Sequence, residues 1–361
     1  MKRIAVLTSG GDAPGMNACL RAVVKTAAAK GAHVFGALDG YDGLVDGNFR
    51  QLTVDRDGGA VGADPEVDAE GGHGGTLIGS ARSARFREAK GRAQAAAKLK
   101  EKGLEGLVVI GGNGSLTGAQ ALMAEHGVRV MGIPASIDND LGCTATCLGV
   151  DSALNTIVEA CDKISDTARA HRRAFVVEVM GRQCGYLAMA SAIAVGADAA
   201  LIREQGKSED TLVDEVASVL RRGFARGKRR QLIIKAEGVE VPTTRLVRRV
   251  EALLMPEMPA VEIRATVLGH VVRGGNPSYL DRMVGGRFAL AAVQALFSGA
   301  SGEMVAWQPQ VPGGIPTEDS SVQRFPFARM LEETAALIDG SSPVTQRRLA
   351  LMERAAGVLQ I

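Results

Sequence analysis

Two glycine-rich segments, residues 8–17 and 111–118, each follow a short apolar run and precede a helical pattern. Glycines in such turns let the backbone approach a phosphate closely, and the free N–H groups of the following helix attract anions. A tight turn that binds nothing is the alternative interpretation. The second segment lacks both the lysine of a P-loop and the spacing of a dinucleotide-binding turn. Two phosphate cradles on successive units favour a long anionic ligand such as a nucleoside triphosphate.

Two carboxylates follow another apolar run. Residues 134–140 read PASIDND, which puts Asp138 and Asp140 just after a predicted strand. Buried carboxylates need partners, and one of such a pair can act as a general base while the other binds a metal ion. A solvated turn rich in Asp and Asn is the simpler alternative.

Arginines and one histidine also stand in turn contexts. Arginine binds phosphate oxygens with a planar fork that stays charged. A single arginine is usually a solvated surface residue, but Gly181 precedes Arg182 and two glycines follow Arg273, which suits close backbone approach. The candidate anion-binding residues are Arg82, Arg173, Arg182, Arg264, His270 and Arg273.

The elements that must position these residues alternate between strands and helices. Helices are predicted at 16–30, 89–102 and 153–167, and strands at 4–8, 33–38, 107–110, 128–133, 175–179 and 232–236. This alternation predicts the α/β class with doubly wound, mostly parallel sheets, whose ligands bind at the carboxyl ends of the strands. Residues 55–75, rich in Asp and Gly, are predicted to form a mobile surface loop.

Composition excludes several classes of protein. The 361 residues are 46% hydrophobic, enough for two domains, and 42 basic against 40 acidic residues exclude a nucleic-acid-binding or polybasic membrane protein. Five cysteines indicate a reducing compartment, and Cys143 and Cys147 lack the second Cys/His pair of a zinc site. With no apolar run of about 18 residues and no signal-peptide core, we expect a cytoplasmic protein.

Taken in order, these segments resemble the ATP-dependent 6-phosphofructokinases of bacteria and the catalytic half of the animal enzymes. The similarity runs from about residue 3 to about residue 290. The matching segments are LTSGGDAPGMN at 7–17, GSAR at 79–82, IDND at 137–140, VEVMGR at 177–182, RATVLGH at 264–270 and RGG at 273–275. The resemblance implies transfer of a phosphoryl group from ATP, with Mg²⁺, to the 1-hydroxyl of fructose 6-phosphate in glycolysis.

The resemblance also implies an architecture of two Rossmann-like domains facing a central cleft. The nucleotide-binding domain would comprise residues 1–149 plus about 271–310, and the sugar-phosphate-binding domain 150–270 plus about 311–361. The active enzyme would be a homo-oligomer, expected to be a homotetramer, with shared active sites and allosteric control. Neither nucleic acid nor a membrane is an expected partner.

The same resemblance implies a role for each matching position. Asp138 would be the general base, and Asp140 would assist the metal. The residues that act on the reacting groups would be Asp138, Arg182, Ser136, Asp140 and Arg82. Sugar phosphate would be held by Ser136, Ile137, Asp138, Arg173, Met180, Gly181, Arg182, Glu237, Arg264, His270 and Arg273, with Arg173 and Arg264 reaching in from a neighbouring subunit. ATP would be held by Gly11, Arg82, Ser83, Gly112, Asn113, Gly114, Ser115 and Gly118.

Three positions depart from the family pattern: Asn113, Ala135, which stands in place of the usual Gly, and Ser83. Asn113 replaces the Asp expected at the Mg²⁺ position and loses a charge that this hard cation prefers. Pyrophosphate-using relatives carry Asp where Gly114 stands and Lys where Ala135 stands, so the small residues here favour ATP. Ser83 replaces an aromatic residue common near the adenine. A pyrophosphate-dependent enzyme and a weak regulatory homologue remain alternatives, and the missing GxGxxG disfavours a dehydrogenase.

The family's effector site is matched in part. Its basic cluster corresponds to Arg21, Lys25, Arg226 and Lys228, and Asp198 replaces a metal-binding Glu. However, Lys25 and Ser165 stand where arginines are expected, and lysine lacks the bidentate fork. Regulation by ADP or phosphoenolpyruvate is therefore left open, and the tail after about residue 309 carries only two amphipathic helical patterns, at 327–338 and 344–359.

Overall fold

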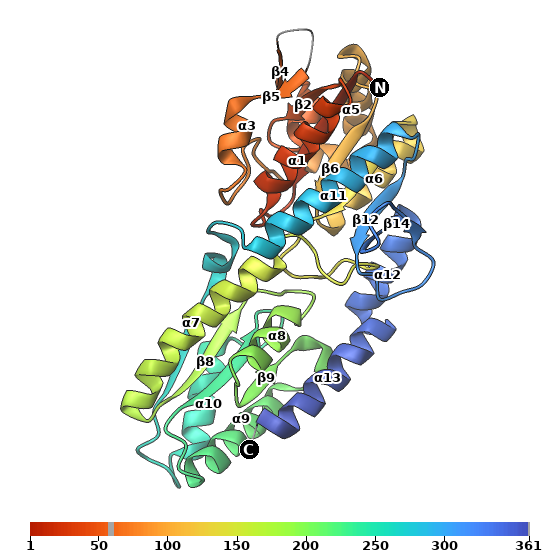
Figure 1. The fold of residues 1–361 in the computed structure, drawn as a ribbon. Helices are drawn as coiled ribbons and strands as arrows, with labels where there is room; N and C mark the ends of the chain where they lie inside the picture. Colours follow the sequence, from red (N-terminus) through yellow and green to blue (C-terminus); the bar gives the residue numbers. More distant parts are fainter. Residues whose placement is uncertain (57–60, 360–361) are drawn as a thin grey trace. The chain divides into compact units, whose positions relative to one another are not determined.

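The computed structural model describes residues 1–56 and 61–359 and divides into two compact units (Figure 1). Unit 1 consists of Met1–Ile137, Leu141–Ser152 and Arg273–Ala336. Unit 2 consists of Asp138–Asp140, Ala153–Val272 and the described residues from Leu337 onward. Among the described residues, no helix combines the length and apolar character that crossing a membrane requires.

An eight-stranded sheet forms the centre of unit 1, in the order β13-β14-β12-β7-β6-β1-β2-β3. The inner strands β12, β7, β6, β1 and β2 run parallel, β3 pairs antiparallel with β2, and β14 pairs antiparallel with both β12 and β13. The strands are β1 (Arg3–Ser9), β2 (His33–Ala37), β3 (Phe49–Gln51), β6 (Leu107–Gly111), β7 (Val130–Pro134), β12 (Glu303–Trp307), β13 (Ile315–Pro316) and β14 (Val322–Pro326). Every residue of β6 and β7 is buried, as expected for central strands covered on both faces.

The helices of unit 1 pack on this sheet or on one another. They are α1 (Met16–Ala29), α2 (Tyr41–Asp46), α3 (Pro65–Glu70), α4 (Ala84–Arg87), α5 (Ala89–Glu101), α6 (Asn113–His126), α11 (Tyr279–Phe297) and α12 (Phe327–Asp339), whose last residues lie in unit 2. Helix α1 packs against α11, where Cys19 lies 3.3 Å from a β-carbon placed on Gly285, and the buried residues of α1 recur at helical spacing.

The stretch 55–75, expected to be a mobile loop, contains regular structure. Strands β4 (Thr53–Asp55) and β5 (Val61–Ala63) form an antiparallel pair, and α3 follows directly. Asp64 caps this helix by accepting a hydrogen bond from the Glu66 N–H, and Pro65 occupies the first turn. The loop prediction is therefore wrong for residues 61–70. The Asp64-Pro65 pair is a helix-start signal, and the many glycines around it made the stretch look irregular. Residues 57–60 of that prediction lie outside the described residues.

The C-terminal tail is divided between the units, which corrects the expectation that residues from about 311 onward belong together. Strand β14 pairs with β12 in the sheet of unit 1, with Trp307 opposite Val322. Phe325 and Phe327 are buried in that unit. Only the last helix, α13 (Pro343–Leu359), belongs wholly to unit 2. An amphipathic pattern shows that one face is buried but does not identify what covers it.

Unit 2 contains a four-stranded parallel sheet in the order β11-β8-β10-β9. Its strands are β8 (Ala174–Val179), β9 (Ala199–Leu201), β10 (Gln231–Ala236) and β11 (Ile263–Val267). Its helices are α8 (Tyr186–Ala194), η2 (Arg203–Gln205), α9 (Glu209–Ala225), α10 (Thr243–Leu254) and α13. Most of α7 (Val150–His171) and all of η3 (Gly269–Arg273) except Arg273 also belong to it.

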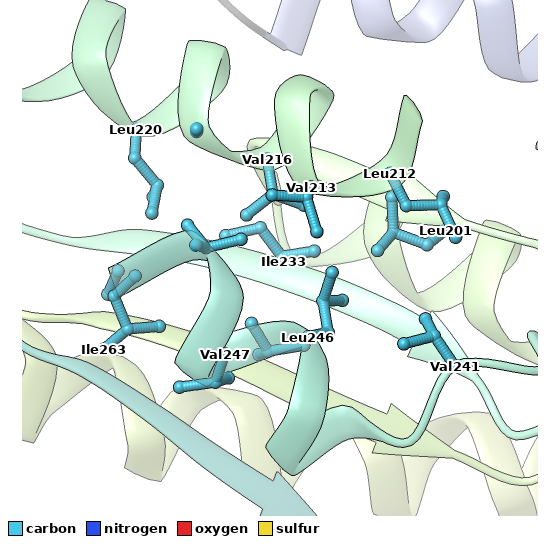
Figure 2. Close-up of a cluster of buried hydrophobic side chains, with 14 of the residues drawn as sticks. Leu201, Leu212, Val213, Val216, Leu220, Ile233, Val241, Leu246, Val247 and Ile263 are labelled. Carbon is cyan, nitrogen blue, oxygen red and sulfur yellow. The ribbon is translucent and has the colours of Figure 1, made fainter. Parts of the chain in front are cut away.

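A continuous apolar cluster holds the helices α9 and α10 to this sheet (Figure 2). Val216 and Leu220 from α9, Leu246 from α10, and Ile233 from β10 are all buried in it. Burying each such aliphatic side chain contributes about 1.5–3 kcal/mol. The cluster therefore packs β10, which ends next to the candidate residue Glu237, against both helices.

The predicted α/β class with mostly parallel sheets is confirmed. All nine predicted strands and helices are present, with ends that shift by a few residues. The helix that follows the second glycine-rich turn begins at Asn113, with Gly112 as its N-cap residue.

Candidate functional site

Three turns that carry candidate residues lie at one edge of the unit 1 sheet. The parallel register aligns Ser9 with Gly111 and Gly111 with Pro134, so β1, β6 and β7 end side by side. The backbone N–H of Ala135 donates to the carbonyl of Gly111 (3.0 Å), which extends the ladder into the turn. The edge therefore collects the turn after Ser9, the start of α6, and Ser136.

Two glycines are required because these turns touch. A β-carbon on Gly111 would lie 2.7 Å from Ser115 Oγ and 2.6 Å from the carbonyl oxygen of Ser9. Gly10 has a φ of 93°, which side chains rarely adopt, and a β-carbon there would meet the same Ser115 hydroxyl at 3.3 Å. Glycine at these two positions has a packing reason as well as any functional one.

Gly112 and Gly114 have a different environment. No atom lies within 4 Å of a β-carbon placed on Gly114, and the nearest to one on Gly112 is 3.6 Å away. Gly112 is the N-cap of α6 and provides no side chain to satisfy the first N–H groups of the helix. The start of α6 at Asn113 thus combines open space with the positive end of a helix dipole, which suits a phosphate.

Residues 79–82 are fastened to the first turn. The hydroxyl of Thr8 donates to the carbonyl of Gly79 (2.7 Å), and that of Ser80 donates to the carbonyl of Gly10 (2.7 Å). Arg82 follows and is exposed. The neighbouring Ser83 is buried as the N-cap of α4, where its hydroxyl accepts from the Phe86 N–H (3.1 Å) and donates to an Asp42 carboxylate oxygen.

An aromatic pair borders Gly118 on α6. The rings of Tyr41 and Phe86 stack with centroids 3.8 Å apart, and a β-carbon on Gly118 would lie 3.0 Å from Phe86. Tyr41 also donates its hydroxyl to the carbonyl of Ser115 (2.7 Å), and burial raises its pKa. Sequence analysis did not identify this pair. The two rings provide aromatic packing close to Ser83, which itself replaces an aromatic residue common in the family.

Arg273, a candidate phosphate ligand, lies against the first glycine-rich turn. Its Nη1 donates to the carbonyl of Asp12 (3.1 Å), and it would be 2.8 Å from a β-carbon on Gly11. The structure therefore brings Arg273 to the candidate nucleotide turn within unit 1.

In unit 2, adjacent strands end at the next group of candidates. Strands β8 and β10 pair in parallel, with Val179 opposite Ala236, and the N–H of Glu237 donates to the carbonyl of Val179 (2.9 Å). Gly181 has a φ of 124°, and a β-carbon on Gly238 would lie 2.2 Å from the carbonyl oxygen of Arg182. Met180 is buried and Arg182 is exposed. Arg182 and Glu237 therefore project from neighbouring strand ends.

The carboxylate segment, residues 138–140, belongs to unit 2, while Ser136 and Ile137 belong to unit 1. Asn139 at its centre is fully buried with a φ of 52°, and Asp138 and Asp140 on either side are partly buried. A left-handed conformation is strained for most residues but tolerated by Asn. Its neighbours are thereby held in a defined turn.

Arg173 and Arg264 lie at the opposite end of the unit 2 sheet. Arg173 immediately precedes β8, Arg264 is the second residue of β11, and both form ion pairs with Glu262. A six-residue strand spans roughly 17 Å, so this arginine pair lies about that far from the β8 end that carries Arg182. His270, by contrast, follows β11 on the Arg182 side. Glu262 was not found from the sequence, because no motif marks it.

A buried carboxylate in unit 1 was also missed. Asp281 on α11 is 2% exposed and accepts hydrogen bonds from the N–H of Gly149 (2.8 Å) and from the N–H and hydroxyl of Ser152 (2.8 and 2.7 Å). Burial raises its pKa, and the hydrogen bonds from Ser152 and Gly149 oppose that effect. Asp281 therefore ties α11 to the start of α7.

The candidate effector residues are already paired with acids. Arg21 and Lys25 both contact an oxygen of Asp68 (2.8 and 2.7 Å), and these hydrogen bonds, Arg21 first, lower the pKa of that carboxyl. Lys228 pairs with the buried Asp198 (2.8 Å). Arg226 is exposed just after α9, and Ser165 accepts a hydrogen bond from Arg230 (2.9 Å).

The described residues contain no group of three or more His, Cys, Asp or Glu side chains arranged to hold a metal ion. Cys143 and Cys147 are buried free thiols, and burial raises the pKa of Cys143 to about 12. A metal at the candidate site would thus need ligands from a bound molecule or water in addition to Asn113 or Asp140.

This α/β architecture and these strand-end turns are those of the phosphofructokinases. The family's sequence description, "Phosphofructokinase", matches residues 3–296, and the chain belongs to that family. A protein of Thermotoga neapolitana named ATP-dependent 6-phosphofructokinase is 42% identical over 338 residues, which cover 94% of this chain and 100% of that protein. One of the same name from Bacillus licheniformis is 44% identical over 308 residues, covering 85% and 90% of the two chains.

Comparison with solved structures also finds phosphofructokinases. Phosphofructokinase from Saccharomyces cerevisiae matches with a TM-score of 0.80 and 33% identity over 100% of this chain. The chain spans about half of that protein, 48% of its length. A pyrophosphate-dependent phosphofructokinase from Marinobacter aquaeolei matches with a TM-score of 0.75 over 98% of this chain and 91% of its own, but at 18% identity it shows the shared fold alone.

Proposed function

We propose that this protein is a 6-phosphofructokinase that transfers the γ-phosphoryl group of ATP to the 1-hydroxyl of fructose 6-phosphate in glycolysis. The observation that carries this proposal is the start of α6. There, the open space beside Gly114 and an uncapped helix N-terminus offer room and charge for a nucleotide's phosphates. The names of the Thermotoga and Bacillus relatives support ATP as the donor.

The donor choice has a steric basis. A side chain at Gly114 would enter the space above the start of α6, and the small Ala135 is 1% exposed, so its methyl group does not obstruct that space. The nucleotide would be held by Gly11, Arg82, Ser83, Gly112, Asn113, Gly114, Ser115 and Gly118. For Ser83 the contact would come from its backbone, because its hydroxyl caps α4.

In the proposed mechanism, a carboxylate oxygen of Asp138 accepts the proton of the sugar 1-hydroxyl. The sugar oxygen forms a bond to the γ-phosphorus while the bond from that phosphorus to the β–γ bridging oxygen breaks, and ADP leaves with the electron pair. Arg82 and Arg182 stabilise the charge on the transferring group, and Ser136 orients the sugar. Most of the rate comes from positioning and charge, since phosphoryl transfer needs little covalent help.

The sugar phosphate would be bound mainly by residues at strand ends. Ile137, Met180, Gly181 and Glu237 would contact the sugar, and His270 and Arg273 the 6-phosphate. Arg173 and Arg264 complete the proposed phosphate clamp, but they lie a strand length away from Arg182 in the same chain. This separation supports a shared site in a homo-oligomer, a homotetramer by our proposal, in which these two arginines serve a neighbouring copy.

Mg²⁺ fits the residues present if the nucleotide supplies most of its ligands. Asp140 offers a carboxylate and Asn113 a carbonyl oxygen, and hard cations bound to phosphates keep several waters. When bound, the ion would neutralise phosphate charge. Asn113 also accepts a hydrogen bond at its backbone carbonyl from Thr117 (2.9 Å), so its position at the start of α6 is defined.

An anionic effector would have to compete with existing ion pairs. Arg21, Lys25, Arg226 and Lys228 form the proposed effector set, and Asp68 and Asp198 already neutralise part of it. We therefore expect weaker effector binding than an unpaired arginine cluster would give. We place the reaction in the cytoplasm, because the five cysteines are free thiols, as expected for a reducing compartment.

The test is formation of fructose 1,6-bisphosphate from fructose 6-phosphate and Mg²⁺ with either ATP or pyrophosphate. Activity with ATP alone is the expected result, and activity with pyrophosphate alone would overturn the donor assignment. A second candidate, a regulatory homologue with weak catalysis, is favoured by Asn113 alone. A regulatory homologue would form no product with either donor, and Asn113→Asp would restore product formation. In an active enzyme, Asn113→Asp should chiefly lower the Mg²⁺ concentration needed for half-maximal rate.

A further inference from the structure

The C-terminal helix α13 contacts the carboxylate segment through one side chain. Arg348 donates from Nη1 to the carbonyl of Asn139 (3.4 Å) and to Cys184 Sγ (3.5 Å). Its guanidinium carbon lies 4.6 Å from the centre of the Tyr186 ring. All four residues belong to unit 2, although Arg348 is 209 positions from Asn139 along the chain.

The carbonyl that Arg348 binds stands between two proposed functional carboxylates. The peptide groups on either side of Asn139 set the directions of Asp138 and Asp140. Asn139 adopts a φ of 52° and is fully buried, so its conformation depends on surrounding contacts to persist. The Cys184 thiol lies 3.9 Å from the same carbonyl and is a weak donor, and burial raises its pKa to about 12. Arg348 provides the charged, stronger contact.

The surroundings suit arginine in particular. A planar guanidinium can stack on the Tyr186 ring while its edge donates to a carbonyl, and the ammonium of lysine cannot do both in one geometry. Thr345 and Val344, one turn earlier on α13, are buried, which holds this face of the helix against unit 2. Arg348 therefore projects from a turn of α13 that is packed against unit 2.

We infer that Arg348 is a positioning residue for phosphoryl transfer: it fixes the Asn139 peptide and thereby the directions of Asp138 and Asp140. This inference rests on the proposed function of Asp138 as the base. It gives the C-terminal helix a part in catalysis that no motif in its sequence indicates.

The kinetic test compares Arg348→Met, which keeps the apolar stem but removes the charge and donors, with Arg348→Lys. The control is Arg354→Met on the same helix, whose guanidinium is exposed and, among the described residues, donates within α13 to Ala350 (3.3 Å). We expect Arg348→Met to lower kcat about 10- to 100-fold with KM for ATP within about twofold, because misplaced reacting groups slow chemistry more than binding. Arg348→Lys should recover part of the lost kcat, and the kcat of Arg354→Met should equal that of wild type.

A second measurement does not depend on activity. Amide hydrogen exchange in a peptide covering 138–140 should be faster in Arg348→Met than in wild type, and unchanged in Arg354→Met. Equal kcat in wild type and Arg348→Met, or equal exchange, would overturn the inference while leaving the proposed function intact. An inactive wild-type protein would instead contradict the proposed function, and exchange would still decide whether Arg348 holds the segment.

Discussion

The guanidinium of Arg273 occupies the space beside Gly11 that a side chain would need. Its Nη1 would lie 2.8 Å from a β-carbon on Gly11, and it donates to the carbonyl of the next residue, Asp12, at 3.1 Å. A residue proposed to bind the sugar phosphate is thus held by the turn proposed to bind the nucleotide, within one compact unit. Glycine at position 11 is needed for this packing.

Gly11→Ala should therefore weaken fructose 6-phosphate binding as well as ATP binding. The added methyl group displaces Arg273, and losing one charge-assisted hydrogen bond costs about 1.5–3 kcal/mol, so KM for fructose 6-phosphate should rise about 10-fold or more. Steady-state kinetics measures this. Gly286→Ala on α11, where a β-carbon meets nothing within 4 Å, is the control and should change neither KM. A rise in KM for ATP alone would show that Arg273 does not serve the sugar phosphate.

Asp138→Asn should reduce kcat by about 100-fold or more, because the amide cannot accept the proton of the 1-hydroxyl. The substitution keeps the size of the side chain, so thermal unfolding should remain close to that of wild type. Asp214→Asn, on an exposed position of α9, provides the matched control and should leave kcat unchanged. Turnover preserved in Asp138→Asn would remove this residue from the role of base.

A mixture of two defective subunits should regain activity if Arg264 serves a neighbouring copy. Arg264→Ser should be defective in sugar-phosphate binding and Asp138→Asn in chemistry, and in a mixed oligomer some sites would combine an intact Arg264 with an intact Asp138. Co-expression of the two variants followed by an assay at low fructose 6-phosphate concentration measures this. Activity no higher than the sum of the separate variants would place both residues in one chain's site.

The buried Asp281 predicts a pH dependence of stability. Its folded-state pKa lies above the ordinary value of 3.8 because burial disfavours the charged form. The folded state then binds more protons than the unfolded state, so the stability that Asp281 contributes is complete below about pH 3.8 and declines as pH rises through the raised pKa.

This dependence can be isolated by comparing wild type with Asp281→Asn, which does not titrate. The variant should be less stable at every pH, because its NH₂ group faces donors from Gly149 or Ser152. The gap in thermal unfolding midpoint should narrow as pH rises from about 4 towards neutrality. A gap that widens with pH would mean that the hydrogen bonds dominate and hold the pKa low.

Much of the fold and of the candidate site could be predicted from local patterns. Apolar runs followed by glycine turns and helical spacing define β1, β6 and α1, because the hydrophobic period and the turn residues are local properties. The segments around Gly11, Asn113 and Asp138 were found for the same reason. The turn after Ser9, the start of α6 and Ser136 share an edge in unit 1, which follows from the parallel ladder that joins Ser9, Gly111 and Pro134.

Contacts between distant segments could not be predicted in this way. An amphipathic pattern marks the buried face of β14 or α13 without naming its partner, so β14 was assigned to the wrong unit and the contact of Arg348 with Asn139 was missed. Glu262 between Arg173 and Arg264 carries no motif, and its significance comes from where two strands begin. Motifs made of adjacent residues can be recognised in the sequence. Which charged side chains face each other across distant segments depends on how the whole chain packs.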